Sequence, residues 1–197
     1  MKQIFSLYFF AFNMVILICI TIFSSNGKYN IVVDNQKQIQ KFILDTRYIW
    51  PVIGYYKITS FFGNREAPTT GASINHGGID IGAPTGSNLV AIANGKVKYT
   101  GFNGAGGYTI IISHDNGIES IYCHVDNIYF PKVGEMVYSG NIIGRVGPKN
   151  VYGVSNNPYK DKNGNPTNGA TTGPHLHFGI RKNGKLINPL ELISKYE

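Results

Sequence analysis

The chain has 197 residues, of which 43% are hydrophobic and 15% are charged, and its formal net charge at pH 7 is +7. The length allows one ordinary domain with an appendage, and the composition supports a folded core. A basic chain attracts anionic partners such as nucleic acid, anionic membrane or an acidic cell-wall polymer. Because the positive charges are scattered and form no Lys- or Arg-rich block, we expect no nucleic-acid binding.

The N-terminal segment is strongly apolar. Residues 4–23, IFSLYFFAFNMVILICITIF, contain no charged residue and are about as many as a helix needs to cross a bilayer. We expect residues 1–25 to be either a signal peptide or an N-terminal membrane anchor, and both would place the rest of the chain outside the cytoplasm, anchored in the cell envelope or secreted. Ile18 precedes Cys19 where a lipoprotein cleavage site requires a small residue, so we expect no lipid on this cysteine.

Residues 26–49 are predicted to be a tether. Within them, NQKQIQKFILD (35–45) places three apolar residues at helical spacing, which indicates a short amphipathic helix. Trp50 precedes a proline, and a residue in that position avoids helical geometry. We therefore expect the folded domain to occupy residues 50–197.

The pattern from residue 50 onward favours β-strands. Asn94-Gly95 and Asp115-Asn116-Gly117 each lie between apolar runs and predict β-hairpins, and Asn183-Gly184 predicts a further turn. No alternation of strands with helices and no internal repeat is visible in the sequence. The expected fold class is therefore all-β, built mainly from antiparallel strands.

Residues 148–172 are rich in Asn, Gly and Pro, and we expect a long loop there. Asp161, Asn163 and Asn165 alternate as in the first part of a calcium-binding loop, but the glycine comes too early and Thr172 stands where the bidentate Glu belongs. We therefore predict turns rather than a calcium site. Long loops inside compact domains are usually functional or disordered, and this one enters directly before a histidine pair.

The stretch TTGPHLHFGI (171–180) contains two of the five histidines of the chain, one residue apart. In an extended strand successive side chains point to opposite faces, so His175 and His177 share one face. The other face is apolar and typical of a core: Leu176, Phe178 and Ile180. Half-buried imidazoles need polar partners, and a metal ion is one such partner.

A second polar cluster, NHGGIDIGAPTG (75–86), places His76 and Asp80 four residues apart. Two glycines between them and Pro84 behind them argue against a helix, so we expect His76 on a turn and Asp80 on a short strand, with both side chains folded inward. Such a pair supplies nitrogen and oxygen ligands suited to zinc, although alone it also fits a histidine paired with a carboxylate. Together with the histidine pair above, it offers three ligands and a spare imidazole.

The strand predicted after the second hairpin turn carries another histidine. Alternation places Tyr122 and His124 on one of its faces and Cys123 on the other. Tyr122 therefore either borders the same groove as His124 or is a packed aromatic residue, and Cys123 is expected to be a free core residue. The remaining histidine, His114, precedes a turn, and we expect it to make a structural hydrogen bond.

Six motifs occur in order over nearly all of residues 50–193. They are ITSFFGNR (58–65), HGGID (76–80), GYTIIISHDNGIESIYCHV (107–125), KVGEMVYSGNIIGRVG (132–147), TGPHLHFGI (172–180) and NGKLINPLELI (183–193). As a set they are highly specific, and the chain resembles the lysostaphin-type, or LytM-like, zinc metallopeptidases of bacterial cell walls. Arg65 ends the first motif near the family's cleft, but an arginine at a strand end is often only a surface charge.

The resemblance implies a fold of the duplicated-hybrid-motif type, a β-sheet groove with a metal on its floor. Because the long loop at 148–172 enters directly before His175, we expect it to form a wall of that groove and either to set substrate preference or to obstruct access. The resemblance also implies that His76, Asp80 and His177 bind Zn2+, and that His124 and His175 flank the metal as the catalytic pair. One of the pair would take the proton of the attacking water while the other steadies the oxyanion. The implied activity is that of a zinc metalloendopeptidase, a hydrolase that cuts peptide bonds in peptidoglycan stems or cross-bridges. Three protein ligands leave a fourth zinc position open, as a catalytic site needs.

Two other function classes stay open. A non-hydrolytic, membrane-anchored scaffold or activator of cell-wall remodelling would keep the fold, but family members used in this way typically lose site residues, and this chain keeps all five. A wall-binding module without chemistry has no need of the HxxxD and HxH motifs. The expected partners are peptidoglycan peptide as substrate and, if residues 4–23 are uncleaved, the membrane. No heptad pattern indicates an obligate assembly, so we expect a monomer.

Overall fold

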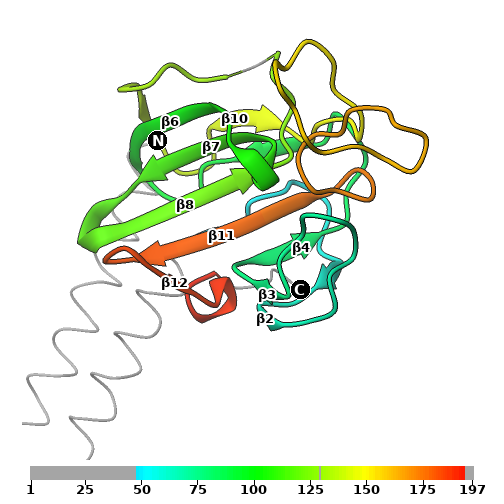
Figure 1. Ribbon diagram of the computed structural model, residues 1–197. Helices are drawn as coiled ribbons and strands as arrows, with labels where there is room; N and C mark the ends of the chain where they lie inside the picture. The colour runs from blue at the N-terminus through cyan, green and yellow to red at the C-terminus, as the bar shows by residue number, and fades with distance from the viewer. Residues whose placement is uncertain (1–47, 129, 194–197) are drawn as a thin grey trace, which may run out of the picture. The chain divides into compact units, whose positions relative to one another are not determined.

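The computed structural model describes residues 48–128 and 130–193 (Figure 1). The apolar run at 4–23 and the helix predicted within 35–45 lie outside these residues, so both stay predictions. In the part of the chain that is described, no helix has the length and apolar character needed to span a membrane.

An antiparallel sheet of eight strands forms the body of the domain (Figure 1). In spatial order it contains β1 (Ile58–Ser60), β4 (Ile79–Ile81), β11 (Leu176–Lys182), β8 (Ile118–Cys123), β7 (Tyr108–Ser113), β6 (Gly95–Phe102) and β9 (Met136–Val137), with β12 (Lys185–Ile187) beside β11. Two short antiparallel pairs complete the strands: β2 (Gly63–Asn64) with β3 (Asn75–His76), and β5 (Asn88–Val90) with β10 (Ile142–Arg145). Single 3-10 turns lie at η2 (Gly104–Gly106), η3 (Asp115–Gly117) and η4 (Pro189–Glu191). The predicted all-β, antiparallel class is confirmed.

Local turn signals predicted two of the strand connections correctly. β7 and β8 pair around Asp115-Asn116-Gly117, and β11 and β12 pair around Asn183-Gly184. The hairpin predicted at Asn94-Gly95 is wrong, because β5 pairs with β10 while β6 pairs with β7 and β9. Asn94 and Gly95 both lack the positive φ that a two-residue hairpin turn requires. Gly95 instead lies close against β7, where an added Cβ would be 2.5 Å from the Ser113 carbonyl oxygen.

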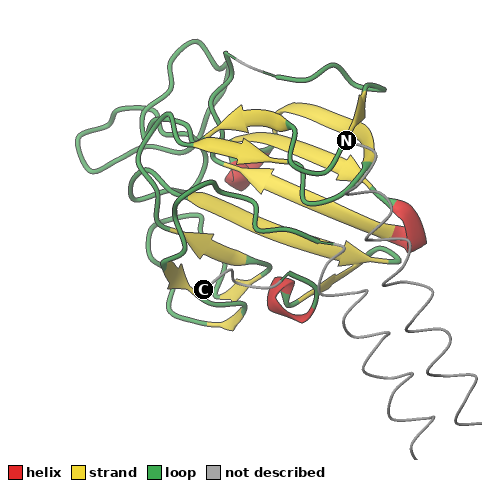
Figure 2. Cartoon of the chain, turned by 180° about the vertical axis from the view of Figure 1, so that it is seen from behind, coloured by secondary structure: helices red, strands yellow, loops and turns green. Residues whose placement is uncertain are grey.

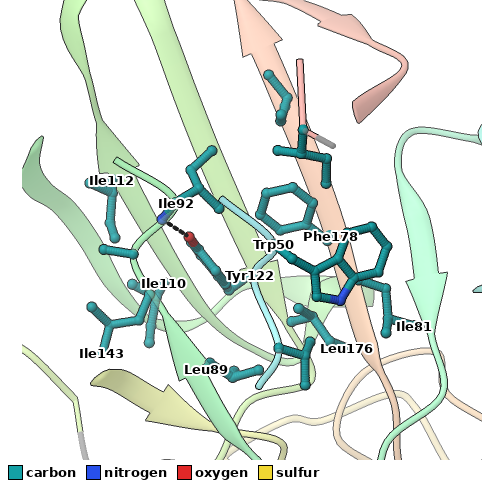
Figure 3. Packing of buried hydrophobic residues seen from close by; sticks show 14 of the residues in the cluster. Trp50, Ile81, Leu89, Ile92, Ile110, Ile112, Tyr122, Ile143, Leu176 and Phe178 are labelled. Carbon is teal, nitrogen blue, oxygen red and sulfur yellow. Dashed lines mark hydrogen bonds between the residues drawn. The ribbon is translucent and has the colours of Figure 1, made fainter. Parts of the chain in front are cut away.

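The main core lies on one face of the sheet (Figure 3). In β11, Leu176, Phe178 and Ile180 are fully buried, which confirms the alternation predicted for that strand. Tyr122 is a packed aromatic residue: its ring meets that of Phe178 edge-on at 5.2 Å, and its hydroxyl oxygen accepts the Ile92 N–H at 3.2 Å (Figure 3). Tyr122 therefore belongs to the core and does not border the groove.

Packing in this core begins with the first described residues. Tyr48 and Trp50 are 3% and 4% exposed and belong to the main core. Between them, the Ile49 N–H donates to the Ile92 carbonyl at 2.9 Å. Packed residues thus precede residue 50, the start predicted for the domain.

The opposite face of the sheet carries a smaller apolar cluster. Ile111, Ile121 and Cys123 are buried there and pack against Tyr99. Cys123 is the free cysteine that was expected, but it lies in this second cluster and is the direct cross-strand partner of His177. Because such partners point to the same side of a sheet, this second face is the one that carries the histidines.

The long loop at 148–172 is built from turns, as predicted. Asp161 Oδ1 accepts the N–H groups of Asn163 and Asn165 at 3.0 and 2.9 Å, so this carboxylate closes a tight turn of its own chain. Figure 2 shows the long loops gathered at the end of the sheet where β11 begins. The loop therefore lies at the same end of β11 as the histidine pair.

Candidate metal centre

Neighbouring strands bring His76, Asp80 and His177 together. His76, expected on a turn, is the last residue of β3, and Asp80 is the middle residue of β4, and the chain bends between them at Gly78. β4 pairs with β11, and in this pairing Asp80 lies directly opposite His177. Strand pairing therefore joins the HxxxD and HxH motifs.

The two glycines allow this close approach. A Cβ on Gly78 would lie 2.3 Å from the Phe178 carbonyl oxygen, and a Cβ on Gly77 would lie 2.9 Å from the Leu186 side chain. The first contact is with the backbone of β11, which cannot move aside without breaking the sheet. Glycine is therefore required at Gly78 for β4 to reach β11.

The side-chain atoms of the three residues form a small triangle. His76 Nε2 lies 3.1 Å from Asp80 Oδ1 and 2.9 Å from His177 Nδ1, and His177 Nδ1 lies 2.9 Å from the same Asp80 oxygen. Two neutral imidazole nitrogens that face each other at this distance can share only one proton. With a carboxylate oxygen beside both, the arrangement favours a cation at its centre.

The donor set and its dimensions fit zinc. Zinc binds imidazole nitrogen and carboxylate oxygen at about 2.0–2.2 Å in tetrahedral sites, which places neighbouring ligand atoms roughly 3.4 Å apart. The observed separations of 2.9, 2.9 and 3.1 Å are slightly shorter, so small side-chain rotations would suffice. His76, Asp80 and His177 could therefore hold a metal ion.

Second partners orient two of these residues. His76 donates its Nδ1–H to the Phe61 carbonyl at 2.7 Å, which leaves Nε2 facing the triangle. Asp80 Oδ2 accepts from Arg65 Nη1 at 2.7 Å, so only Oδ1 faces the histidines. Partners of this kind set the tautomer and the orientation of metal ligands.

Sequence reasoning underestimated Arg65. Its Nη1 donates to Ser60 Oγ at 2.6 Å as well as to Asp80, and its Nε is buried without a hydrogen-bond partner among the described residues. A surface charge would show neither feature. The signal that could have identified it is its place at the end of ITSFFGNR, the first of the six motifs on which the resemblance was based.

His124 and His175 lie beside the triangle. Their ring centroids are 4.7 Å apart, and the ring of His124 is 6.2 Å from that of His177. His175 donates its Nδ1–H to the Gly173 carbonyl at 2.8 Å, and His124 donates its Nδ1–H to the Asn168 carbonyl at 2.7 Å. In this tautomer each ring keeps an unprotonated Nε2, as a general base requires.

The face on which His124 lies differs from the one that alternation predicted. Alternation places it with Tyr122, which points into the main core. β8 ends at Cys123, however, and His124 has a φ of 60°, in the left-handed region that few non-glycine residues adopt. The reversal directs its ring to the opposite face. Two backbone hydrogen bonds hold this conformation, from the His124 N–H to the Gly106 carbonyl and from the Gly147 N–H to the His124 carbonyl.

Burial and mutual contact shift the acid–base properties of the cluster. Burial alone would raise the pKa of Asp80, but the imidazoles of His175, His177 and His76 around it hold that pKa well below its usual range. Burial, with His175 and His177 close by, lowers the pKa of His124 to about 3. Burial also lowers the pKa of His177. At neutral pH a carboxylate therefore lies beside neutral His124 and His177, and these are the protonation states that bind metals.

The cluster opens into a cleft of about 460 Å3. The cleft is lined by His124, His175 and His177 and, from the long loop, by Ala170 and Thr172. The loop forms part of the wall, as predicted. A larger cavity of about 510 Å3 beside β9 and β10 has no histidine or aspartate in its lining and offers no comparable set of ligands.

His114 lies apart from the cleft and is structural, as predicted. Its Nδ1–H donates to the Asn94 carbonyl at 2.8 Å, and its Nε2 accepts from the Ser120 hydroxyl at 2.8 Å. The other four histidines of the chain are the ones that gather around Asp80.

The sequence matches peptidase family M23 over residues 74–189, more than half of the chain. It is 33% identical over 138 residues to the DD-carboxypeptidase/endopeptidase Mpg of Neisseria meningitidis, a match that covers 70% of this chain and 27% of that protein. It is 32% identical over 146 residues to the murein hydrolase activator NlpD of Salmonella dublin, covering 73% of this chain and 30% of that protein. The chain thus spans less than a third of the length of these curated relatives.

Solved structures share the fold. A zinc-containing peptidase from Vibrio cholerae matches with a TM-score of 0.56 and 28% identity, over 73% of this chain and 39% of that chain. The catalytic domain of lysostaphin from Staphylococcus simulans matches with a TM-score of 0.51 and 27% identity, over 69% of this chain and 90% of that chain. The chain therefore belongs to peptidase family M23, among the lysostaphin-type metallopeptidases.

Proposed function

We propose that this protein is a zinc-dependent endopeptidase that hydrolyses peptide bonds in peptidoglycan stems or cross-bridges. The observation that carries the proposal is the triangle of His76 Nε2, Asp80 Oδ1 and His177 Nδ1, with no side longer than 3.1 Å, in a cleft that also contains His124 and His175. Membership of family M23 supports a peptidase, and the likeness to a DD-carboxypeptidase/endopeptidase supports the substrate class.

His76, Asp80 and His177 would hold the zinc ion. When bound, zinc lowers the pKa of its water ligand from about 15.7 towards about 7 and polarises the carbonyl group of the substrate. Arg65 occupies the second oxygen of Asp80, so the carboxylate contributes one ligand atom only.

His124 and His175 would handle the proton. Each gives its Nδ1–H to a backbone carbonyl, and in the neutral form of the ring this leaves Nε2 as the acceptor. The low pKa of His124 keeps that ring neutral at pH 7. The pair would accept the proton of the attacking water, and the ring that takes it becomes a donor, first for the oxyanion and then for the leaving amine.

The proposed place of action is the cell envelope, outside the cytoplasmic membrane. A net charge of +7 favours attraction to an anionic wall polymer. The apolar run at 4–23 would direct the domain there, either as a signal peptide or as an anchor.

Digestion of purified peptidoglycan tests the proposal. The zinc-loaded, full-length protein should release new amine ends, a chelator should abolish the release, and added zinc should restore it. Mass spectrometry of the products would identify the bond that is cut. Intact peptidoglycan after incubation with folded, zinc-loaded protein would contradict the proposal.

A non-hydrolytic activator of cell-wall hydrolases is the second candidate, and the likeness to NlpD favours it. An activator would raise the rate of a separate cell-wall hydrolase and would do so without cutting peptidoglycan itself. Its effect would also survive the loss of a metal ligand. The intact set of five site residues favours the enzyme.

A further inference from the structure

The C-terminal end of the long loop packs directly against His124. Thr167, Asn168 and Thr171 are 2%, 0% and 6% exposed, although the middle of the loop is largely solvent-exposed. Two backbone hydrogen bonds hold this end of the loop, both at 2.8 Å. The Asn168 N–H donates to the Lys149 carbonyl at the start of the loop, and the Ala170 N–H donates to the Ala105 carbonyl in η2. Residues 167–171 are therefore a fixed part of the domain.

Every backbone and side-chain polar atom of Asn168 makes a hydrogen bond. Its backbone carbonyl accepts the Nδ1–H of His124 at 2.7 Å. Its side-chain Oδ1 accepts the Tyr108 N–H at 2.7 Å, and its Nδ2 donates to the Val125 carbonyl at 3.0 Å. The side chain thus connects the first residue of β7 to the residue after His124, and this connection sets where the carbonyl of Asn168 lies.

Glycines of neighbouring segments allow the backbone to approach Asn168 closely. A Cβ on Gly107 would lie 2.3 Å from the Asn168 carbonyl oxygen, and a Cβ on Gly147 would lie 2.7 Å from its Nδ2. Gly169, with a φ of 75°, approaches so closely that a Cβ there would lie 2.3 Å from the Ala105 carbonyl oxygen. Three chain segments therefore fit closely around one asparagine.

We propose that Asn168 is the positioning residue of His124: it holds the ring as the Nδ1–H tautomer, with the lone pair of Nε2 available to the cleft. This inference rests on the proposed function, in which His124 accepts or donates the proton. The opposite tautomer would place a proton on Nε2 and remove the acceptor, so the carbonyl of Asn168 decides whether the ring can act as a base. The long loop then supplies a working part of the site as well as a wall.

The tautomer can be measured without any assay of hydrolysis. Nitrogen-15 NMR of the zinc-loaded full chain, with the His124 signals assigned by their loss in His124→Ala, should show a protonated Nδ1 and an unprotonated Nε2. A protonated Nε2 in the wild-type protein would overturn the proposal, whatever the variants do.

Variants then test the role of the side chain. Asn168→Ala and Asn168→Ser should lower kcat by about 10- to 100-fold. KM and zinc content should stay close to the wild-type values, and a second tautomer should appear in the NMR signals of His124. Asn157→Ala is the matched control: it removes a hydrogen bond from the same loop, Nδ2 to the Thr167 carbonyl at 2.8 Å, and it should change neither kcat nor the tautomer.

A folded Asn168 variant with unchanged kcat and a single Nδ1–H tautomer would overturn the proposal. If both variants fail to fold, the wild-type NMR measurement still decides it. Wild-type protein that shows the predicted tautomer but hydrolyses no peptidoglycan would support the role of Asn168 and overturn the proposed hydrolase. Failure of the Asn168 proposal and failure of the proposed function are therefore distinguishable.

Discussion

Individual side chains of the site divide by what their atoms contact. His76, Asp80 and His177 direct their ligand atoms at one another, at 2.9 to 3.1 Å. His124 and His175 each donate an Nδ1–H hydrogen bond to a backbone carbonyl and lie beside this group. The first three should therefore determine whether a metal is held, and the other two should determine the rate of turnover.

Alanine substitutions of the two histidines of HxH should have different consequences. His177→Ala should lose both zinc and peptidoglycan digestion, because it removes one of three ligands. His175→Ala should keep its zinc while turnover falls by about 10²- to 10⁴-fold, the usual contribution of a general acid or base. Zinc content by elemental analysis and release of amine ends would measure the two effects. His114→Ala should keep both properties, and normal digestion by His177→Ala would show that the ligand assignment is wrong.

Arg65→Ala should weaken zinc binding by about 10- to 100-fold, because Asp80 Oδ2 loses its donor and the carboxylate is free to rotate. Competition with a chromophoric chelator would measure the affinity. Arg181→Ala is the control, since Arg181 contacts Glu119 at 3.4 Å and none of the candidate ligands. Equal affinities of the two variants would exclude the orienting role of Arg65.

Among the elements, the pairing of β4 with β11 matters most for the site. It places Asp80 opposite His177, and it depends on a glycine corner that follows β3. The end of β8 is equally decisive, because the left-handed conformation of His124 directs that ring to the face of β11 that carries the other histidines. The regular strands fix the relative positions of the backbone segments, whereas the glycine corner after β3 and the end of β8 place the side chains of Asp80 and His124.

Gly78→Ala should destabilise the protein by about 1–3 kcal/mol, the usual cost of overpacking, because the new Cβ would lie 2.3 Å from the Phe178 carbonyl oxygen. The same change should weaken zinc binding, since β4 must move away from β11. Thermal or urea unfolding would measure the first effect. Gly173→Ala, whose Cβ would meet nothing within 4 Å, should unfold like the wild type. An unchanged unfolding midpoint in Gly78→Ala would show that β4 and β11 can accommodate the added Cβ without loss of stability.

For the whole molecule, the buried titratable groups couple stability to pH. The pKa of His124 is about 3 in the folded protein and about 6.5 in an unfolded chain, so between these values the unfolded state binds more protons. Stability therefore rises with pH across this window. The lowered pKa of His177 acts in the same direction, and the lowered pKa of Asp80 extends the loss of stability to still lower pH.

The zinc-free protein should therefore lose free energy of unfolding as the pH falls from about 6.5 towards about 3, and should show little change above that range. Urea unfolding curves recorded in steps of pH would measure the slope. His124→Gln should have a shallower slope, because a group that protonates on unfolding has been removed. Stability that is flat or increases on acidification would contradict the burial of neutral histidines.

Much of the site was visible in the sequence. The five residues of the predicted centre lie in motifs whose residue types suit zinc, and alternation correctly separated His177 from the core residues of β11. Arg65 was noticed at the end of a motif but not distinguished from a surface charge, and Asn168 was not identified at all, because local sequence does not show that one meets Asp80 and the other His124. Both contacts join residues that are far apart in the chain.

The amino-acid sequence by itself determined the β class, the alternation of β11 and the turns at 115–117 and 183–184. Strand periodicity and turn preferences act over a few neighbouring residues, so they can be inferred without knowing the fold. Only the tertiary structure decided that β6 pairs with β7 and β9, that Cys123 lies on the histidine face, and that His124 turns to join it. The physical reason is that strand partners and a left-handed residue are stabilised by contacts with distant segments, and no local pattern specifies those contacts.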